Sequence, residues 1–232
     1  MPGKTGVILQ PSYIPWRGYF HQIAKADVFV FYDDVKYDKH GWRNRNRIKT
    51  PSGSQWLTIP VFSKGVEKNQ TPVNQIEINW NQNWNRKHWT ALELAYAKAP
   101  YFEHFAPLIS NFYESHPTLL ADFTIDTTIQ LARAIGIAST QFTRSSELDH
   151  ISGQKTDRLI QILTRLGITH YISGPSAKDY IDPEPFTQAG ISLEYMRYDY
   201  PKYEQLYPPF DPQVSVLDLL FMHGPKAIDY IL

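Results

Sequence analysis

The stretch Thr5–Asp34, TGVILQPSYIPWRGYFHQIAKADVFVFYDD, decides the fold class. It opens with an apolar run that stops at Pro11, which is typical of a buried strand. The segment GYFHQIAKA then has apolar residues at helical spacing, and DVFVFYDD is a β-branched and aromatic run closed by two carboxylates. Strand, short helix and strand in succession predict a βαβ unit, and therefore a parallel sheet with a right-handed crossover.

The rest of the chain continues this pattern with two interruptions. The segments NRIKT and QWLTIPV flank Pro-Ser-Gly-Ser, which predicts a β-hairpin, and NQIEINW at residues 74–80 reads as a further strand. Three helical patterns follow, with stops before Pro100 and Pro117, and strands then alternate with helices up to a last helix closed by Gly224. We therefore expect an α/β fold: an open parallel Rossmann-like sheet with a β-hairpin insertion and an α-helical lobe.

The order of these patterns also predicts three parts of the chain. Residues 1–82 would form an N-terminal α/β half that carries the hairpin, and residues 83–137 would form the helical lobe. Residues 138–232 would form a C-terminal α/β half that completes the same sheet.

Composition excludes several classes of protein. The chain has 232 residues with 23 basic and 23 acidic side chains, so its zero net charge argues against duplex nucleic acid as a partner. It has no cysteine, which excludes a disulfide scaffold, a Cys-zinc site, an Fe–S cluster and a thiol nucleophile. No apolar run approaches the length of a membrane span, and the first apolar run is too short for a signal peptide. We expect a cytoplasmic protein with no membrane partner.

Three polar segments follow predicted strands, and ligands of open parallel sheets bind outside the carboxyl ends of the strands. Proline or glycine in these segments fixes the backbone or lets it approach a ligand, and the aromatic side chains of the first segment would form a wall of the site. The candidates are Gln10, Pro11, Tyr13, Trp16 and Arg17 after the first strand, Asp33 and Asp34 after the second, and Ser173, Gly174 and Lys178 after THYI.

Simpler interpretations stay open for these segments. The prolines could form a rigid turn and nothing more, and the two aspartates could cap a turn instead of supplying an acid, a base or a metal contact. A carboxylate pair with no third ligand at metal spacing is weak support for magnesium. We therefore expect no dedicated metal site, and the cofactor is left open with Mg2+ as one candidate.

The string HGWRNRNRIK, residues 40–49, is the most basic part of the chain. Six basic residues stand between Lys36 and Lys49, with one acidic residue among them. In an extended segment Arg43, Arg45 and Arg47 share one face, where guanidinium groups suit phosphate or carboxylate. The alternative is an edge strand that its charges protect from aggregation. His40, beside these arginines, is a further candidate catalytic residue.

Common catalytic signatures are absent. The sequence has no G-x-G-x-x-G, Walker A, H-E-x-x-H or G-x-S-x-G motif. This removes the most frequent patterns for NAD-dependent enzymes, nucleotide triphosphatases, zinc proteases and α/β-hydrolases.

The strings QPSYIPWRGYFHQIAKADVFVFYDDVKY, RNRIKT, WLTIPV, YISGPSAKDYI and SVLDLLFMHG resemble the WbqC-like family of bacterial proteins. The matching strings run from about residue 7 to 225, nearly the whole chain. The family is named for a product of an O-antigen gene cluster, and its members are typically found near genes for surface polysaccharides or other modified small molecules. The resemblance implies a bacterial, cytoplasmic, biosynthetic protein and supplies no catalytic residue.

A more distant similarity is to nucleotidyltransferases. QPSYIPWRGYF stands where that superfamily has a His-x-Gly-His motif after its first strand, and SGPSAK stands where it has a second phosphate-contacting segment. The motif histidines are missing here, because Ile14 and either Trp16 or Arg17 occupy their places. Arg17 and the arginine cluster could replace the charge that those histidines supply.

These observations lead to two hypotheses of different class. The first is a transferase for a small anionic donor: a nucleotide-sugar, a phosphopantetheine-linked group or an aminoacyl donor, with a nucleotidyltransferase-type enzyme as a variant. Gln10 and Tyr13 would orient the substrate, the arginines and Lys178 would bind phosphate, and Asp33 or Asp34 would supply a base or metal contact. The second is a non-catalytic binding subunit of a biosynthetic complex. The sequence leaves the oligomeric state open.

Overall fold

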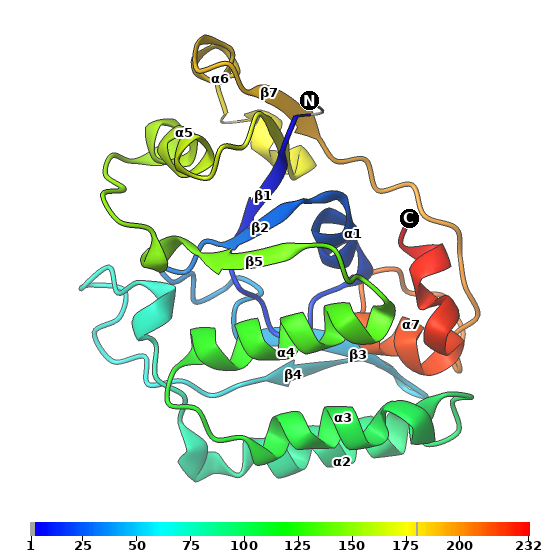
Figure 1. The fold of residues 1–232 in the computed structure, drawn as a ribbon. Helices are drawn as coiled ribbons and strands as arrows, with labels where there is room; N and C mark the ends of the chain where they lie inside the picture. The colour runs from blue at the N-terminus through cyan, green and yellow to red at the C-terminus, as the bar shows by residue number, and fades with distance from the viewer. Residues whose placement is uncertain (1–2, 180) are drawn as a thin grey trace.

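The computed structural model describes residues 3–179 and 181–232. Five strands of these residues form one parallel sheet in the order β5-β2-β1-β6-β7 (Figure 1). This confirms the predicted α/β class and its open parallel sheet. The strands are β1 (Thr5–Leu9), β2 (Val28–Phe31), β5 (Gln141–Arg144), β6 (His170–Ser173) and β7 (Ser192–Tyr195).

The helices lie where the sequence periodicity places them, apart from short 3-10 turns. The described α-helices are α1 (Arg17–Lys25), α2 (Trp84–Tyr96), α3 (Phe102–Glu114), α4 (Leu120–Ile135), α5 (Lys155–Arg165), α6 (Glu184–Gln188) and α7 (Val216–His223). The 3-10 turns are η1 (Val73–Gln75), η2 (Trp80–Gln82), η3 (Ser145–Glu147), η4 (Pro175–Asp179) and η5 (Gly224–Tyr230).

The predicted βαβ opening consists of β1, α1 and β2. Gly6 lies opposite Val28 and Leu9 opposite Phe31, so the two strands are parallel neighbours. All four residues of β2 are buried, which explains why its sequence is a continuous apolar and aromatic run without alternation. Helix α1 buries Phe20 against the same core.

Two hydrophobic cores cover the two faces of the sheet. One contains Val30 of β2, Ile162 of α5 and Phe186 of α6. The other, larger core contains Phe29 and residues of α1, α2, α3, α4, α7 and the hairpin. Figure 1 shows α5 above the sheet and α4 below it, with the hairpin and the α2–α3 pair farther below. Helices on both faces are typical of a doubly wound sheet.

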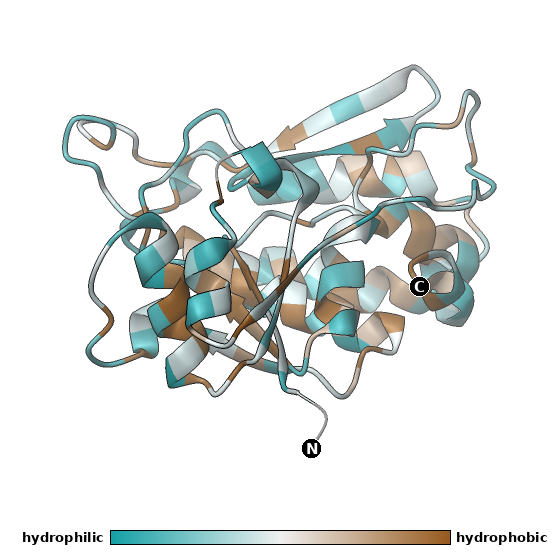
Figure 2. Ribbon diagram, turned by 90° about the horizontal axis from the view of Figure 1, so that it is seen from above, coloured by the Kyte–Doolittle hydropathy of each residue, from teal (hydrophilic) through white to brown (hydrophobic). Residues whose placement is uncertain are grey.

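The predicted hairpin is confirmed. Strands β3 (Arg45–Thr50) and β4 (Gly53–Thr58) pair antiparallel in a separate two-stranded sheet, and the turn between them ends at Gly53, whose φ of 109° favours glycine. Five of the six residues of β4 are half-buried or exposed, because only Leu57 is buried. Figure 2, a view from above, shows many hydrophilic and intermediate residues on the protruding hairpin.

The predicted strand at residues 74–80 is wrong. The segment contains two 3-10 turns, η1 and η2, and it pairs with other parts of the chain only through isolated bridges, Val61 to Ile78 and Glu77 to Leu119. Its alternation of apolar and polar residues has another cause: Ile76 and Ile78 are buried in the large core while Glu77 is exposed. Because no neighbouring strand forms a continuous ladder of hydrogen bonds with this segment, its backbone stays irregular although its side chains are alternately buried and exposed.

Among the described residues, no helix combines the length and the apolar character that crossing a membrane requires. The domain boundaries at residues 82 and 137 stay a prediction.

Candidate functional site

The five parallel strands end at one edge of the sheet, which we name the carboxyl rim. It consists of the segments that directly follow the strands: Gln10–Tyr13, Tyr32–Asp34, Ser145–Glu147, Gly174–Lys178 and Met196 onward. Strand β1 lies between β2 and β6, and its two neighbours are reached by helices on opposite faces of the sheet. Because the connection after β1 and the connection before β6 cross opposite faces of the sheet, a crevice is left between them at the carboxyl ends of β1 and β6. This is the usual ligand position in such sheets.

Asp33 forms the link between the ends of β2 and β5. Its side chain is fully buried and accepts hydrogen bonds from the Ser146 N–H at 3.1 Å and the Ser146 hydroxyl at 2.8 Å. The Ser145 hydroxyl accepts the Asp33 N–H at 3.2 Å. These contacts satisfy both carboxylate oxygens, so Asp33 stabilises the rim and offers little to a ligand.

Asp34 is held differently from Asp33. One carboxylate oxygen lies 2.6 Å from the Ser145 hydroxyl, and the other forms an ion pair with Arg158 of α5. Its side chain is 21% exposed, so one part of it reaches the rim surface. Of the two predicted aspartates, Asp34 is therefore the one that a ligand can contact.

Arg43 follows Trp42, whose carbonyl accepts the Tyr13 N–H at 3.3 Å, so Arg43 stands next to the segment after β1. Its guanidinium acts electrostatically on Tyr19, where burial raises the pKa of the phenol and the attraction of Arg43 lowers it. The Tyr19 hydroxyl donates to the Gln10 carbonyl at 3.1 Å, which connects this group to the rim. Burial lowers the pKa of the Arg43 guanidinium itself, against the attraction of Tyr19, Asp38 and Tyr37.

The Arg43 guanidinium has no direct partner in the described part of the chain. No ion pair or hydrogen bond is recorded for it, and its Nε is buried without an acceptor. A partly buried cation without a hydrogen-bond acceptor is costly, because the attraction of more distant groups does not replace the hydrogen bonds to water that burial removes. An anionic ligand would satisfy it.

Gln10 and Pro11 lie at the rim directly after β1. The Gln10 carbonyl is occupied by Tyr19, whereas its half-buried side-chain amide has no hydrogen-bond partner among the described residues. Pro11 is buried and fixes the backbone at this point. The Gln10 amide is thus available to a ligand beside Arg43.

The β6 side of the crevice is open. A Cβ built at Gly174 would meet no atom within 4 Å, so the backbone there is accessible. Ser173 is buried, and its carbonyl accepts the Met196 N–H at 2.9 Å. The exposed Lys178 has its Nζ 5.2 Å from the centre of the Tyr195 ring and forms no ion pair with a described residue. Lys178 is thus a second cation of the rim that no described carboxylate neutralises.

Tyr13 points away from the rim. Its side chain is fully buried, and its hydroxyl lies 2.6 Å from the Tyr113 hydroxyl and 2.9 Å from Nδ1 of His88. The His88 imidazole also bonds to the backbone of Thr58, so its second nitrogen donates to a carbonyl and Nδ1 accepts the Tyr13 proton. Tyr13 joins the corner after β1 to the helical lobe.

Arg17 and Trp16 are engaged by the segment that follows β7 and, for Arg17, by the C-terminal turn. Arg17 is 4% exposed, donates to the carbonyls of Pro201 at 2.9 Å and Tyr230 at 3.2 Å, and stacks 4.5 Å from the centre of the Tyr200 ring. Trp16 packs edge-on against the ring of Tyr198, with 4.9 Å between ring centres. Both residues attach α1 to the C-terminal segment.

His40, Arg45 and Arg47 lie on the outer side of the hairpin. His40 is exposed and its carbonyl accepts a hydrogen bond from Arg45, while Arg47 bonds to the Gln213 side chain at 2.9 Å. Both arginines stack on Trp56, at 4.9 Å and 5.6 Å from the ring centre. The structure thus places the three arginines in two groups, with Arg43 at the rim and the other two on the hairpin.

Sequence reasoning missed Arg158 and Ser145, which hold Asp34. Ser145 directly follows β5, so the rule that selected the ends of β1, β2 and β6 would also have selected it. Arg158 has no such signal, because it lies on an amphipathic helix far from Asp34 in sequence.

Within residues 3–179 and 181–232, no three histidine or carboxylate side chains gather as a metal site would require. Both oxygens of Asp33 serve the fold, and Asp34 is paired with a cation, so the rim offers few ligands to a divalent ion.

These features define an α/β protein of the doubly wound, Rossmann-like type, with polar and cationic side chains at the carboxyl rim. The chain belongs to the WbqC-like protein family, whose model matches residues 10–230. It is similar to Rv1507c of Mycobacterium tuberculosis, an uncharacterized protein, with 40% identity over 230 residues that cover 98% of this chain and 97% of the relative. No solved structure matches the chain.

Proposed function

We propose that this protein is a biosynthetic transferase that binds a small anionic donor in the crevice between β1 and β6. One observation carries the proposal. Arg43 is a partly buried cation for which no described residue provides a hydrogen-bond acceptor, and it lies at the carboxyl end of β1, the central strand. A phosphate or carboxylate group would supply the missing acceptor and form charge-assisted hydrogen bonds with the guanidinium.

The neighbouring groups suit the same kind of ligand. Lys178, on the β6 side, adds a mobile positive charge, and Gly174 lets a ligand approach the backbone. The Gln10 amide, at the end of β1, can both donate and accept a hydrogen bond. We therefore assign the donor to phosphate-bearing or carrier-linked molecules: a nucleotide-sugar, a phosphopantetheine-linked group or an aminoacyl donor.

Asp34 is the residue that we assign to proton transfer. It reaches the rim surface, and Ser145 and Arg158 fix its orientation, as a general base requires. The family resemblance supports a role in surface-polysaccharide or related small-molecule modification, which we place in the cytoplasm.

A non-catalytic binding subunit is the second candidate. The hydrogen bonds of the two aspartates favour it. Both carboxylate oxygens of Asp33 accept hydrogen bonds from Ser146, and Asp34 already forms an ion pair with Arg158, so neither is a free base. In that case the rim would bind the anionic molecule and present it to another protein.

The test is a thermal-shift screen of the purified protein against nucleotide-sugars, nucleoside triphosphates, coenzyme A derivatives and aminoacyl analogues, with and without magnesium. A ligand at about 100 times its dissociation constant adds about 2.7 kcal/mol to the free energy of unfolding, which raises the melting temperature visibly. Stabilisation by one anionic class, lost when Arg43 is replaced by Gln, supports the proposal. Stabilisation that Arg43→Gln leaves intact would place the site elsewhere.

The same ligand distinguishes the two candidate functions. An enzyme should lose turnover on Asp34→Asn while the ligand still raises its melting temperature. A binding subunit should show no turnover in either form and should keep its ligand affinity.

A further inference from the structure

The two edges of the hairpin differ in how their backbone groups are satisfied. On the β3 edge, the Arg47 N–H donates to the Asn46 side-chain oxygen at 2.8 Å, and the Arg47 carbonyl accepts the Ser215 N–H at 2.8 Å. The Lys49 N–H donates to the Tyr96 hydroxyl at 2.9 Å. The outer edge of β3 is therefore covered by the rest of the protein.

The outer edge of β4 is open at Ser54 and Trp56, whereas His88 of α2 bonds to the backbone of Thr58 at the end of the strand. Trp56 lies opposite Arg47, and Ser54 lies opposite Lys49. Residues that face each other in an antiparallel ladder point their backbone groups both inward or both outward, so the N–H and C=O groups of Ser54 and Trp56 point away from β3. In the described chain no partner is recorded for these two N–H groups.

Nothing in the sequence of β4 protects this edge. Natural edge strands carry Lys, Pro, a bulge or a covering segment that prevents further pairing. Strand β4, GSQWLT, has no charged residue and no proline, and Trp56 is 46% exposed. An open edge of this kind is the template onto which an extended peptide adds as a new strand.

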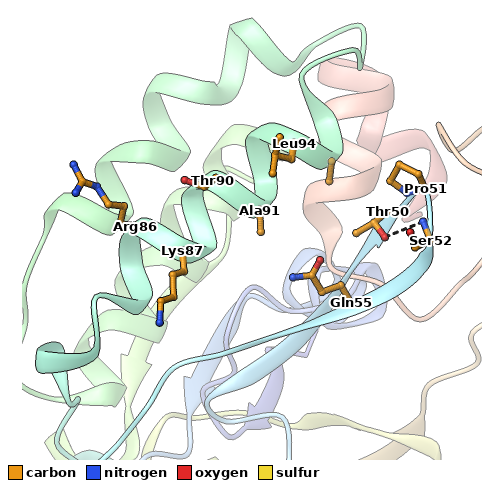
Figure 3. A pocket seen from close by; sticks show the side chains of 10 residues that line it. Thr50, Pro51, Ser52, Gln55, Arg86, Lys87, Thr90, Ala91 and Leu94 are labelled. Atoms are coloured by element: carbon orange, nitrogen blue, oxygen red, sulfur yellow. Dashed lines mark hydrogen bonds between the residues drawn. The ribbon is translucent and has the colours of Figure 1, made fainter.

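A hollow of about 630 Å³ lies between this hairpin and α2 (Figure 3). Gln55 of β4 lines it from the hairpin, and Lys87, Ala91 and Leu94 line it from the helix. The small side chain of Ala91 leaves the space unfilled, and Leu94 is 79% exposed beside it. Alternate side chains of a strand paired with β4 would point toward this hollow.

The charge of the hollow selects its occupant. Arg86 and Lys87, both exposed, form no ion pair with a described residue, and the lining contains no acidic residue. The two cations also lie in the first turn of α2, whose N-terminus is itself positive and has no acidic side chain. A second copy of this chain would bring the same cations together, whereas an acidic segment would complement them.

We propose that an extended acidic segment of a partner protein pairs with β4 as a third strand and directs acidic side chains toward Arg86 and Lys87. The main-chain hydrogen bonds to Ser54 and Trp56 supply affinity, and the basic hollow supplies selectivity.

The test uses a short capped peptide in which glutamate alternates with valine, and a matched peptide in which lysine replaces glutamate. Amide exchange of the full-length protein is followed by NMR during titration. We expect the acidic peptide to slow exchange of the Ser54 and Trp56 amides about tenfold at saturation, because they become hydrogen-bonded. Absence of this protection at millimolar acidic peptide, or equal protection by the lysine peptide, overturns the proposal.

Two variants of Trp56 separate the contribution of its backbone N–H from that of its indole ring. Trp56→Pro removes the outward N–H from an edge position that tolerates proline, and Trp56→Ala is its control because it loses the indole but keeps the N–H. We expect Trp56→Pro to bind at least about tenfold more weakly than Trp56→Ala. Equal affinity of the two variants would contradict strand addition.

The charge contribution is tested by Arg86→Glu combined with Lys87→Glu. The control is Lys64→Glu combined with Lys68→Glu in an exposed loop, which makes the same change in net charge. Loss of acidic-peptide binding only in the first pair supports the proposal. Equal loss in both pairs, or peptide-independent dimerisation of the wild-type protein by light scattering, would contradict it.

Discussion

The side-chain amide of Asn46 holds the carbonyl of Ile14 at 2.8 Å and that of Tyr13 at 3.1 Å. Ile14 has a φ of 35°, in the left-handed region that β-branched residues rarely adopt. The hairpin therefore stabilises a strained backbone at the corner between β1 and α1, directly beside the carboxyl rim. This contact explains why a buried asparagine stands among the arginines of the hairpin.

Replacing Asn46 by Ala should destabilise the protein by about 2 kcal/mol, because two buried carbonyl groups lose their donor. The measurement is urea unfolding at neutral pH. Asn111→Ala, at an exposed position of α3, is the control and should change the free energy of unfolding little. An Asn46→Ala protein as stable as wild type would show that Ile14 adopts its backbone conformation without this support.

His88 should make the stability of the protein depend on pH. Burial lowers the pKa of its imidazole to about 4, from an ordinary value of 6.5. The unfolded chain therefore takes up this proton at a higher pH than the folded protein, so stability is complete above pH 6.5 and decreases as the pH falls toward 4. The expected loss is about 3 kcal/mol.

Urea unfolding between pH 4 and pH 7 measures this effect. His88→Gln should be less stable at neutral pH and should lose much of the decrease between pH 6.5 and pH 4. His104→Gln, at an exposed position, should retain the wild-type dependence. If His88→Gln retains it as well, another group causes the pH dependence.

Replacing Tyr13 by Phe should reduce stability by about 1 to 3 kcal/mol and leave ligand affinity unchanged. The hydroxyl links Tyr113 to His88 inside the protein, and its removal leaves His88 Nδ1 without a donor. Unfolding and ligand titration of the same variant separate the two effects. A large loss of affinity in a stable Tyr13→Phe protein would mean that Tyr13 contacts the ligand.

Asp34→Asn should decrease turnover by about 10² to 10⁴-fold, the usual contribution of a general base. The amide can still accept the Ser145 hydrogen bond, so the fold should persist. Asp182→Asn, an exposed residue outside the site, is the control. Undiminished turnover in Asp34→Asn would exclude the proposed proton transfer and favour the binding-subunit function.

The fold was predictable where the signal is local. The run GVIL, the helical spacing of Tyr19 and Ile23, and the Pro-Ser-Gly turn each fix an element through neighbouring residues alone. The segment at residues 74–80 failed for the same reason, because its alternation matches a strand and only the tertiary structure shows that no ladder accompanies it.

The site was less predictable, because its chemistry depends on distant partners. Nothing near Arg17 in sequence indicates that Pro201 and Tyr230 bind its guanidinium, and nothing near Asp34 indicates Arg158. Arg43 resembles its neighbours Arg45 and Arg47 in sequence, and only burial beside Tyr19 distinguishes it.

The central claim is that Arg43 binds an anionic ligand at the carboxyl rim. The most direct measurement is calorimetric titration of inorganic pyrophosphate into the wild-type protein, Arg43→Gln and the exposed control Arg165→Gln. The account predicts that Kd rises at least about tenfold in Arg43→Gln, since one charge-assisted contact is worth about 1.5 to 3 kcal/mol, and stays at the wild-type value in Arg165→Gln. Wild-type affinity in Arg43→Gln, or an equal loss in both variants, would contradict it.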